Sequence, residues 1–120
     1  MRVREIMSAS FSTIDAQAPL AEAFEATEER NLGALLVMTS GQVAGVITRK
    51  DVARFYVGGD EEASHKQIRE FMNQRIASCY AETDVREAQR LVSRIRCQHL
   101  VVCNREKQVV GLVSVADLKR

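Results

Sequence analysis

Apolar residues recur along this chain with two different spacings. A helical spacing places mostly apolar side chains on one face of two segments, at Leu20, Ala23, Phe24 and Thr27 and again at Val85, Ala88, Val92 and Ile95. Pro19 suits the first turn of the first helix, and Thr83 is the expected N-cap of the second. After each helix come two β-rich runs joined by a polar turn, at 34–38 and 42–48 and then at 99–103 and 108–114. These runs predict two hairpins.

Shorter segments complete the same order of elements twice. A brief extended stretch precedes each long helix, at 11–15 and 76–80. A short helix is expected after each hairpin, at 49–56 and 115–120. The predicted unit is therefore β, α, β, β, α, which indicates an α/β fold of the mixed α+β kind.

The two units are copies of one sequence pattern. VREIM at 3–7 returns 65 residues later as IREFM at 68–72, and ALLVM at 34–38 returns at the same distance as HLVVC at 99–103. One residue is added in the second hairpin turn, so GVITRKD at 45–51 matches GLVSVAD at 111–117. We therefore divide the chain into repeat 1 at 1–57, a polar linker with paired glycines at 58–66, and repeat 2 at 67–120.

The repeat has a consequence for packing. Neither copy buries its sheet face alone, so the two copies are expected to pack together about a pseudo-twofold axis. VREIM and IREFM are expected to pack between copies or between subunits.

Composition narrows the classes of partner. The 120 residues carry 17 Lys and Arg against 16 Asp and Glu, a formal charge of +1, which gives no reason to expect a polyanion or an anionic membrane as partner. The longest apolar stretches fall far below the roughly 20 residues that span a bilayer. The first residues lack the apolar core of a secretory signal, so we expect a cytoplasmic protein. A nucleic-acid partner is not expected, because the chain has no basic stripe with interleaved aromatics.

Each copy ends its second β-rich run with the same chemistry. A glycine and two apolar residues precede a hydroxyl, Thr48 or Ser114, and a carboxylate follows three residues later, Asp51 or Asp117. In a structural interpretation the hydroxyl is a helix N-cap and the carboxylate reaches back to the N–H of the cap residue. In a functional interpretation the helix N-terminus attracts phosphate, the hydroxyl adds a donor and the carboxylate accepts hydrogen bonds from a ribose diol. Repetition in both copies adds weight to the functional interpretation.

The tandem βαββα repeat with these two motifs resembles a cystathionine-β-synthase (CBS) domain pair, also called a Bateman module, over residues 3–120. The resemblance implies binding of adenine nucleotides or adenosyl compounds in clefts between the copies, and association as disc-like dimers. It implies that Asp51 and Asp117 hold ribose hydroxyls, and that Thr48 and Ser114 contact phosphate or ribose. It also implies that the backbone around Thr13, Ile14, Ser78 and Cys79 meets the adenine ring.

The resemblance further implies that each cleft is formed across the pseudo-twofold axis. Cleft one would join Thr48, Arg49 and Asp51 to Ser78, Cys79 and His99. Cleft two would join Ser114 and Asp117 to Thr13, Ile14 and Ala34.

The two implied clefts differ in charge. Arg49, His99 and the nearby Arg96 suit a phosphate chain in cleft one, whereas Val115, Ala116 and Ala34 take the corresponding places in cleft two. We therefore expect tighter nucleotide binding in cleft one. The alternative is an ordinary structural role, at a strand edge for His99 and on the solvated surface for Arg49 and Arg96.

Two other functions remain open alongside ligand sensing. The three cysteines are odd in number and lack a CxxC pair, which indicates reduced thiols that mostly fill the core. Cys97 and His99 lie two apart on a predicted strand and share a face, so a metal or redox response that also uses Cys79 or Cys103 is one alternative. A ligand-free dimeric interaction scaffold is the other. No nucleophile with a base and no carboxylate pair supports catalysis, so we expect a protein that is not an enzyme.

The favoured hypothesis is a stand-alone CBS pair that senses an adenosine-containing small molecule and requires no cofactor. The resemblance covers essentially the whole chain, so we expect no attached catalytic or transport domain, and a separate, unidentified effector protein as the partner of a homodimer. The ligand is left open among AMP, ADP, ATP, S-adenosylmethionine and a dinucleotide. Arg49 favours one that bears phosphate.

Overall fold

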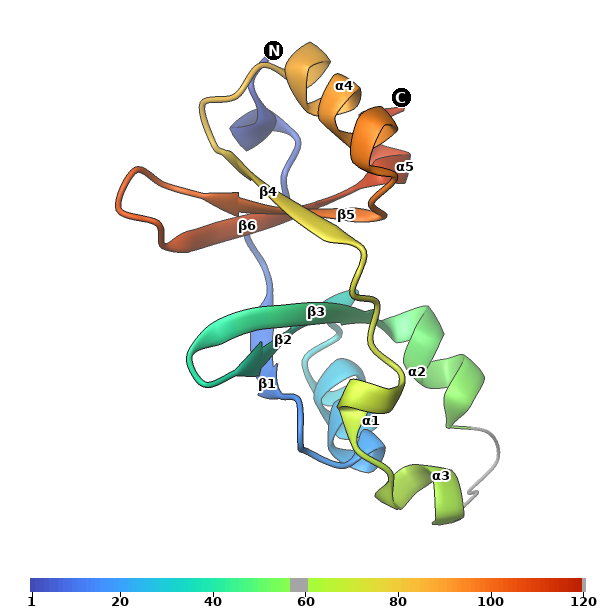
Figure 1. Ribbon diagram of the computed structural model, residues 1–120. Helices are drawn as coiled ribbons and strands as arrows, with labels where there is room; N and C mark the ends of the chain where they lie inside the picture. Colours follow the sequence, from blue (N-terminus) through green and yellow to red (C-terminus); the bar gives the residue numbers. More distant parts are fainter. Residues whose placement is uncertain (57–60, 120) are drawn as a thin grey trace. The chain divides into compact units, whose positions relative to one another are not determined.

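A computed structural model describes residues 1–56 and 61–119 and confirms the predicted order of elements in both copies (Figure 1). The first copy contains β1 (Ser12–Asp15), α1 (Leu20–Glu29), β2 (Ala34–Thr39), β3 (Gln42–Thr48) and α2 (Arg49–Phe55). The second contains β4 (Ile76–Tyr80), α4 (Val85–Ile95), β5 (His99–Cys103), β6 (Val109–Ser114) and α5 (Val115–Leu118). Two short 3-10 helices, η1 (Val3–Glu5) and η2 (Ile68–Glu70), and a short helix α3 (Glu61–His65) complete the described chain.

Each copy forms its own three-stranded sheet with the same connectivity. In the first copy β1 pairs parallel with β2, and β2 pairs antiparallel with β3. The second sheet repeats this with β4, β5 and β6. The hairpin register shifts at corresponding places, between Val37 and Met38 and between Val102 and Cys103. The repeat in sequence is therefore also a repeat in structure, and it includes the position of the register shift in each hairpin.

Each sheet has a separate apolar core beneath its long helix. Leu20 and Ala23 of α1 are fully buried against Leu35, Val37 and Ile47 of the first sheet. In the second copy, the core joins Ala88 and Val92 of α4 to residues of β5 and β6: Leu100, Val102 and Val113. These are the positions that the helical and β periodicities predict. Within the described residues, no helix is long and apolar enough to cross a bilayer.

The two compact units of the structure do not coincide with the two sequence repeats. The first residues of each repeat pack with the other repeat. One unit comprises 11–74 and the other comprises 1–10 together with 75–120. VREIM therefore packs on the second sheet, where the N–H of Val3 donates to the carbonyl of Thr83 at 2.8 Å. IREFM packs on the first unit through the equivalent bond, from the N–H of Ile68 to the carbonyl of Ala18 at 2.9 Å. The expectation that these segments pack between copies is confirmed.

The residues after VREIM and IREFM cross a strand at a glycine. Val46 of β3 exchanges two backbone hydrogen bonds with Asn73, at 3.0 and 2.8 Å, and Leu112 of β6 does the same with Ser8, at 2.9 and 2.8 Å. A Cβ added at the preceding residue, Gly45, would lie 2.7 Å from the carbonyl oxygen of Asn73. One added at Gly111 would lie 2.6 Å from Sδ of Met7 and 3.0 Å from the carbonyl oxygen of Ser8. The glycine of each motif is therefore explained by backbone approach.

Two details of α4 differ from the sequence prediction. Thr83 is not the N-cap: Asp84 holds that position, and its carboxylate accepts from the N–H of Arg86 at 2.8 Å, which lowers the pKa of the Asp84 carboxyl. Thr83 instead accepts the N–H of Tyr80 through its hydroxyl oxygen, at 3.1 Å. Ile95 is half exposed instead of buried, because the helix ends there and the chain turns at Arg96 with a φ of 59°. Cys97, just after this turn, is buried in the core.

The predicted linker at 58–66 is partly helical. Its residues 58–60 lie outside the described residues, and Glu61–His65 form α3. Ser64 is buried, and its hydroxyl donates to the carbonyl of Glu61 at 2.8 Å. The sequence analysis took this segment as a loop because it is polar and begins with two glycines.

We predict that Gly45→Ala lowers the free energy of unfolding by roughly 1–3 kcal/mol, because the added methyl meets a backbone carbonyl that cannot move alone. Gly111→Ala should cost less, since its nearest contact is the flexible end of Met7. Gly33→Ala is the matched control, because a Cβ at Gly33 meets nothing within 4 Å. Urea denaturation measures all three, and an equal loss in the three variants would contradict this account.

Candidate functional site

The N-terminus of α2 is closed by reciprocal hydrogen bonds between Thr48 and Asp51. The hydroxyl oxygen of Thr48 accepts from the N–H of Asp51 at 3.1 Å, and the Asp51 carboxylate accepts from the N–H of Thr48 at 3.0 Å. Thr48 is extended, with φ −94° and ψ 162°, so β3 runs directly into the helix. The predicted capping box is therefore confirmed.

Ser114 and Asp117 form a related arrangement at α5 with different hydrogen bonds. Ser114 is the N-cap and its hydroxyl oxygen accepts from the N–H of Asp117 at 3.3 Å. The same hydroxyl donates to the Asp117 carboxylate at 2.8 Å. The carboxylate of Asp117 is thus held by a side chain, whereas that of Asp51 is held by the backbone.

Among the described residues, Asp51 and Arg49 form ion pairs with residues of their own unit. Arg54, one helical turn beyond Asp51, forms an ion pair with it at 3.1 Å. The guanidinium of Arg49 donates to Asn31 at 2.7 Å and to Glu28 at 3.2 Å. Arg49 therefore links the start of α2 to the last turn of α1 and the loop that follows it.

The sheet register places the predicted site residues in rows within each unit. Ala34 of β2 lies opposite Thr48 of β3, and His99 of β5 lies opposite Ser114 of β6. The backbone repeats this equivalence: the N–H of Arg49 donates to the carbonyl of Gly33, and the N–H of Val115 donates to the carbonyl of Gln98. Each unit therefore carries one hydroxyl and carboxylate pair beside the start of its middle strand.

The stretches predicted to meet adenine lie on the outer strands β1 and β4. Thr13 is exposed and Ile14 is buried, while Ser78 is exposed and Cys79 is half-buried. A surface groove of about 500 Å³ runs beside Thr13 and Ile14, and one of about 670 Å³ runs beside Ser78 and Cys79. The long helix of the same unit forms the other wall of each groove.

A further groove, of about 440 Å³, lies next to Asp117. Its walls are mostly apolar and come from the N-terminal segment and from both helices of the second copy: Met1, Ile6, Met7, Ser8, Val85 and Leu118. Sequence reasoning missed the N-terminal wall because Met7 and Ser8 are far from Asp117 in the chain. The repeat offered one signal, since VREIM was already expected to pack on another copy.

The three cysteines have raised thiol pKa values. Burial, with smaller contributions from Cys103, Cys97 and Glu87, raises the pKa of Cys79 to about 11. Burial also raises the pKa of Cys97 and of Cys103. Among the residues that the structure describes, no group of three His, Cys, Asp or Glu side chains gathers as a metal site would require.

The structure thus brings the predicted residues together within each unit, with Ala34 beside Thr48 and His99 beside Ser114. The two clefts between the copies stay a prediction. Cleft one would join Thr48, Arg49 and Asp51 to Ser78, Cys79 and His99. Cleft two would join Ser114 and Asp117 to Thr13, Ile14 and Ala34. The contacts of Arg49 with Glu28 and Asn31 were not foreseen, because spacing alone does not reveal contacts between separate elements. The Asp51–Arg54 pair follows the helical i,i+3 rule.

Comparison with known proteins gives consistent matches over nearly the whole chain. A probable arabinose 5-phosphate isomerase from Haemophilus influenzae is 26% identical over 116 residues, which are 97% of this chain and 34% of that protein. A conserved CBS domain protein of unknown function from Thermoplasma acidophilum has a similar structure, with a TM-score of 0.74, 24% identity, and coverage of 100% of this chain and 68% of that one. A putative signal-transduction protein with CBS domains from Burkholderia ambifaria has a TM-score of 0.71 at 24% identity, with coverage of 99% and 91%.

The family model for the CBS domain matches the chain twice, at residues 3–58 and 68–120. These two ranges hold the two copies of the repeat, each with its hydroxyl and carboxylate pair at the end of a strand. The chain therefore belongs to the CBS domain family, as a tandem pair of CBS domains.

Proposed function

We propose that this tandem CBS pair is a regulatory module that binds an adenosine-containing ligand of the AMP, ADP and ATP class and acts by binding, without catalysis. One observation carries the proposal: both units present a hydroxyl and a carboxylate together at a strand end, Thr48 with Asp51 and Ser114 with Asp117. Each pair groups several acceptors at one point, and the Thr48 hydroxyl adds a donor in the first unit, which suits a sugar diol.

The carboxylates keep acceptor capacity after their structural hydrogen bonds are made. A carboxylate has about four lone-pair positions. Asp51 uses one for the N–H of Thr48 and another for the exposed Arg54, and Asp117 uses one for the hydroxyl of Ser114. Ribose hydroxyls can therefore be accepted without loss of either helix cap.

The groove next to Asp117 has the composition of a site for a small, partly apolar ligand. Its volume of about 440 Å³ falls in the range of ligand pockets, roughly 300–1,000 Å³. Apolar side chains from the N-terminal segment and α5 line it, and Asp117 supplies a carboxylate. We propose that a nucleoside lies here with its sugar toward Asp117.

Arg49 supports a phosphate group in the ligand of the first unit. Its present partners, Glu28 and Asn31, are both exposed, and a surface ion pair of this kind contributes only about 0–1 kcal/mol. Exchange of Glu28 for a phosphate would therefore cost little and would form a charge-assisted bond.

Signalling requires that the ligand binds two conformations of the module with different affinity. A regulatory role agrees with the description of one similar protein as a putative signal-transduction protein with CBS domains. We propose that the module works as a homodimer and passes ligand occupancy to a separate effector protein.

We predict that millimolar AMP, ADP or ATP raises the melting temperature of the purified protein, because a ligand that binds only the native state stabilises it by mass action. S-adenosylmethionine and NAD are measured alongside to define the ligand class. Asp51→Ala and Asp117→Ala should each reduce the nucleotide-induced shift, and the double variant should abolish it.

The matched control is Asp84→Ala, since Asp51→Ala also removes a cap. Asp84 is itself the N-cap of α4, and its carboxylate accepts from the N–H of Arg86. Its replacement therefore also removes a carboxylate that closes a helix start, but Asp84 belongs to neither hydroxyl and carboxylate pair. Its loss should lower the baseline melting temperature, as loss of a cap does, and leave the nucleotide-induced shift intact. Equal shifts in the wild type and the double variant would refute the assigned contacts, and no shift with any compound would refute the ligand class.

The cysteines supply a separate test of the redox alternative. A thiol with a pKa near 11 is almost entirely protonated at neutral pH, and the thiolate is the reactive form. We predict that iodoacetamide at pH 8 alkylates Cys79 on the order of 100-fold more slowly than free cysteine, and that the rate keeps rising beyond pH 10. Mass spectrometry of timed samples measures this rate. Rapid alkylation of Cys79 at pH 7 would contradict the prediction and support the redox hypothesis.

A further inference from the structure

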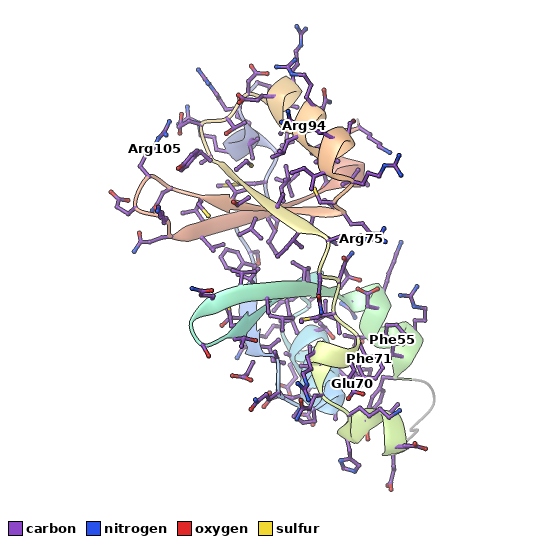
Figure 2. All side chains as sticks on the ribbon, in the orientation of Figure 1. Phe55, Glu70, Phe71, Arg75, Arg94 and Arg105 are labelled. Carbon is purple, nitrogen blue, oxygen red and sulfur yellow. The ribbon has the colours of Figure 1, made fainter. Side chains whose placement is uncertain are left out.

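The groove between the outer strand β4 and the long helix α4 lies within one unit and has a basic helical wall. Arg90 and Arg94 on that wall are four residues apart, so they share one face of α4 at a separation of about 6 Å along the helix axis. Both side chains are exposed (Figure 2 labels Arg94 on α4). Neither hydroxyl and carboxylate pair lines this groove. It is therefore a candidate site separate from those two pairs.

The corresponding groove of the first copy has the opposite balance of charge. It lies between β1 and α1, and its walls include Asp15 and Glu22 with a single guanidinium, that of Arg30. Arg30 donates to the hydroxyl of Ser12 at 2.8 Å. In the second copy two guanidiniums line the groove against one carboxylate, that of Glu87. An anion is therefore favoured in the second groove and disfavoured in the first.

The two guanidiniums of α4 have no carboxylate partner in the part of the chain that the structure describes. None of the ion pairs found there includes Arg90 or Arg94. Like charges four residues apart on a helix repel each other and destabilise it. A bound anion would remove this repulsion and would form charge-assisted hydrogen bonds with both side chains.

The rest of the groove suits a short carbon chain with polar ends. Leu91 and Cys79 line it and are half-buried, so they supply apolar surface. Burial raises the pKa of Cys79 to about 11, so its thiol carries no negative charge at neutral pH. The hydroxyl of Thr83 accepts the N–H of Tyr80 through its oxygen, which leaves its O–H as a donor. The guanidinium of Arg105 lies 4.4 Å from the centroid of the Tyr80 ring and adds positive charge beside this wall.

We propose that this groove binds a small organic dicarboxylate, with one carboxylate on Arg90 and the other on Arg94. A guanidinium binds a carboxylate through two parallel hydrogen bonds, so two guanidiniums one turn apart match two carboxylates joined by a short methylene chain. Leu91 contacts that chain. Glu87, one turn before Arg90, disfavours a third negative group at its end of the groove. The site goes beyond the proposed function, because its ligand has neither a base nor a sugar.

Titration of the isotope-labelled protein with glutarate at low salt, followed through the backbone amide NMR signals, tests the site. Pentanoate has the same carbon chain with one carboxylate, and inorganic phosphate is an anion with a single head. Each should bind at least about 10-fold more weakly than glutarate. The signal of Thr13, in the first groove, should stay unchanged. Saturable shifts with glutarate are expected for residues of the second groove: Ser78, Tyr80, Arg90 and Arg94.

Arg90→Gln with Arg94→Gln should weaken glutarate binding by about 10-fold or more, because each carboxylate loses its bidentate partner. The amide spectrum of this variant also shows whether it is folded. The matched control is Lys50→Gln with Arg69→Gln, which removes two positive charges from exposed positions of the other unit. The control should bind glutarate as the wild type does.

Failure of this inference and failure of the proposed function give different results. Asp51→Ala with Asp117→Ala removes the assigned nucleotide contacts and leaves the groove, so this variant should bind glutarate with unchanged affinity. No saturable shift with glutarate, equal affinity for pentanoate, or unchanged binding by Arg90→Gln with Arg94→Gln would overturn the dicarboxylate site, whatever the nucleotides do.

Discussion

The passage of a flanking segment over the glycine of β3 or β6 is the constraint on which each unit depends. Val46 and Asn73, and likewise Leu112 and Ser8, exchange two backbone hydrogen bonds, so a segment from the neighbouring repeat is tied to the strand that ends at the motif. A side chain on Gly45 or Gly111 would occupy the space that this segment needs. The same strand continues two residues later into Thr48 or Ser114, the residue that begins the short helix. The hydroxyl and carboxylate pair is thus placed by a strand that is held on both sides.

The two copies keep this construction and differ in what surrounds it. The cap of α2 uses a backbone N–H to hold Asp51, and the cap of α5 uses a hydroxyl to hold Asp117. Arg49 follows the first hydroxyl and Val115 follows the second, and the long helices beside them carry opposite charges. The two copies therefore share one geometry and differ in the charges around it. Under the proposed function, this difference would lead the two units to prefer different ligand groups.

Much of the fold follows from periodicity, because the alternation of helical and β spacing is strong in both copies. The strand β3 has the bounds 42–48 that the sequence predicts, and Thr48 and Ser114 are the caps that their spacing to an acid predicts. The prediction of Thr83 as the cap of α4 was wrong because the neighbouring Asp84 has a similar preference for that position, and only the local hydrogen bonds decide between them. The contacts of Arg49 with Glu28 and Asn31 join residues 21 and 18 positions apart in the chain, which no local pattern specifies.

The central claim is that the Asp51 and Asp117 carboxylates receive the diol of an adenosine ligand. Calorimetric titration with AMP and with 2′,3′-dideoxy-AMP tests it most directly, since the two compounds differ only in the hydroxyls that the carboxylates would accept. A site built to hydrogen-bond a hydroxyl rejects the analogue without it, so the account predicts that AMP binds and that the dideoxy analogue binds at least about 100-fold more weakly. Equal affinity for the two compounds, or binding of neither, would contradict it.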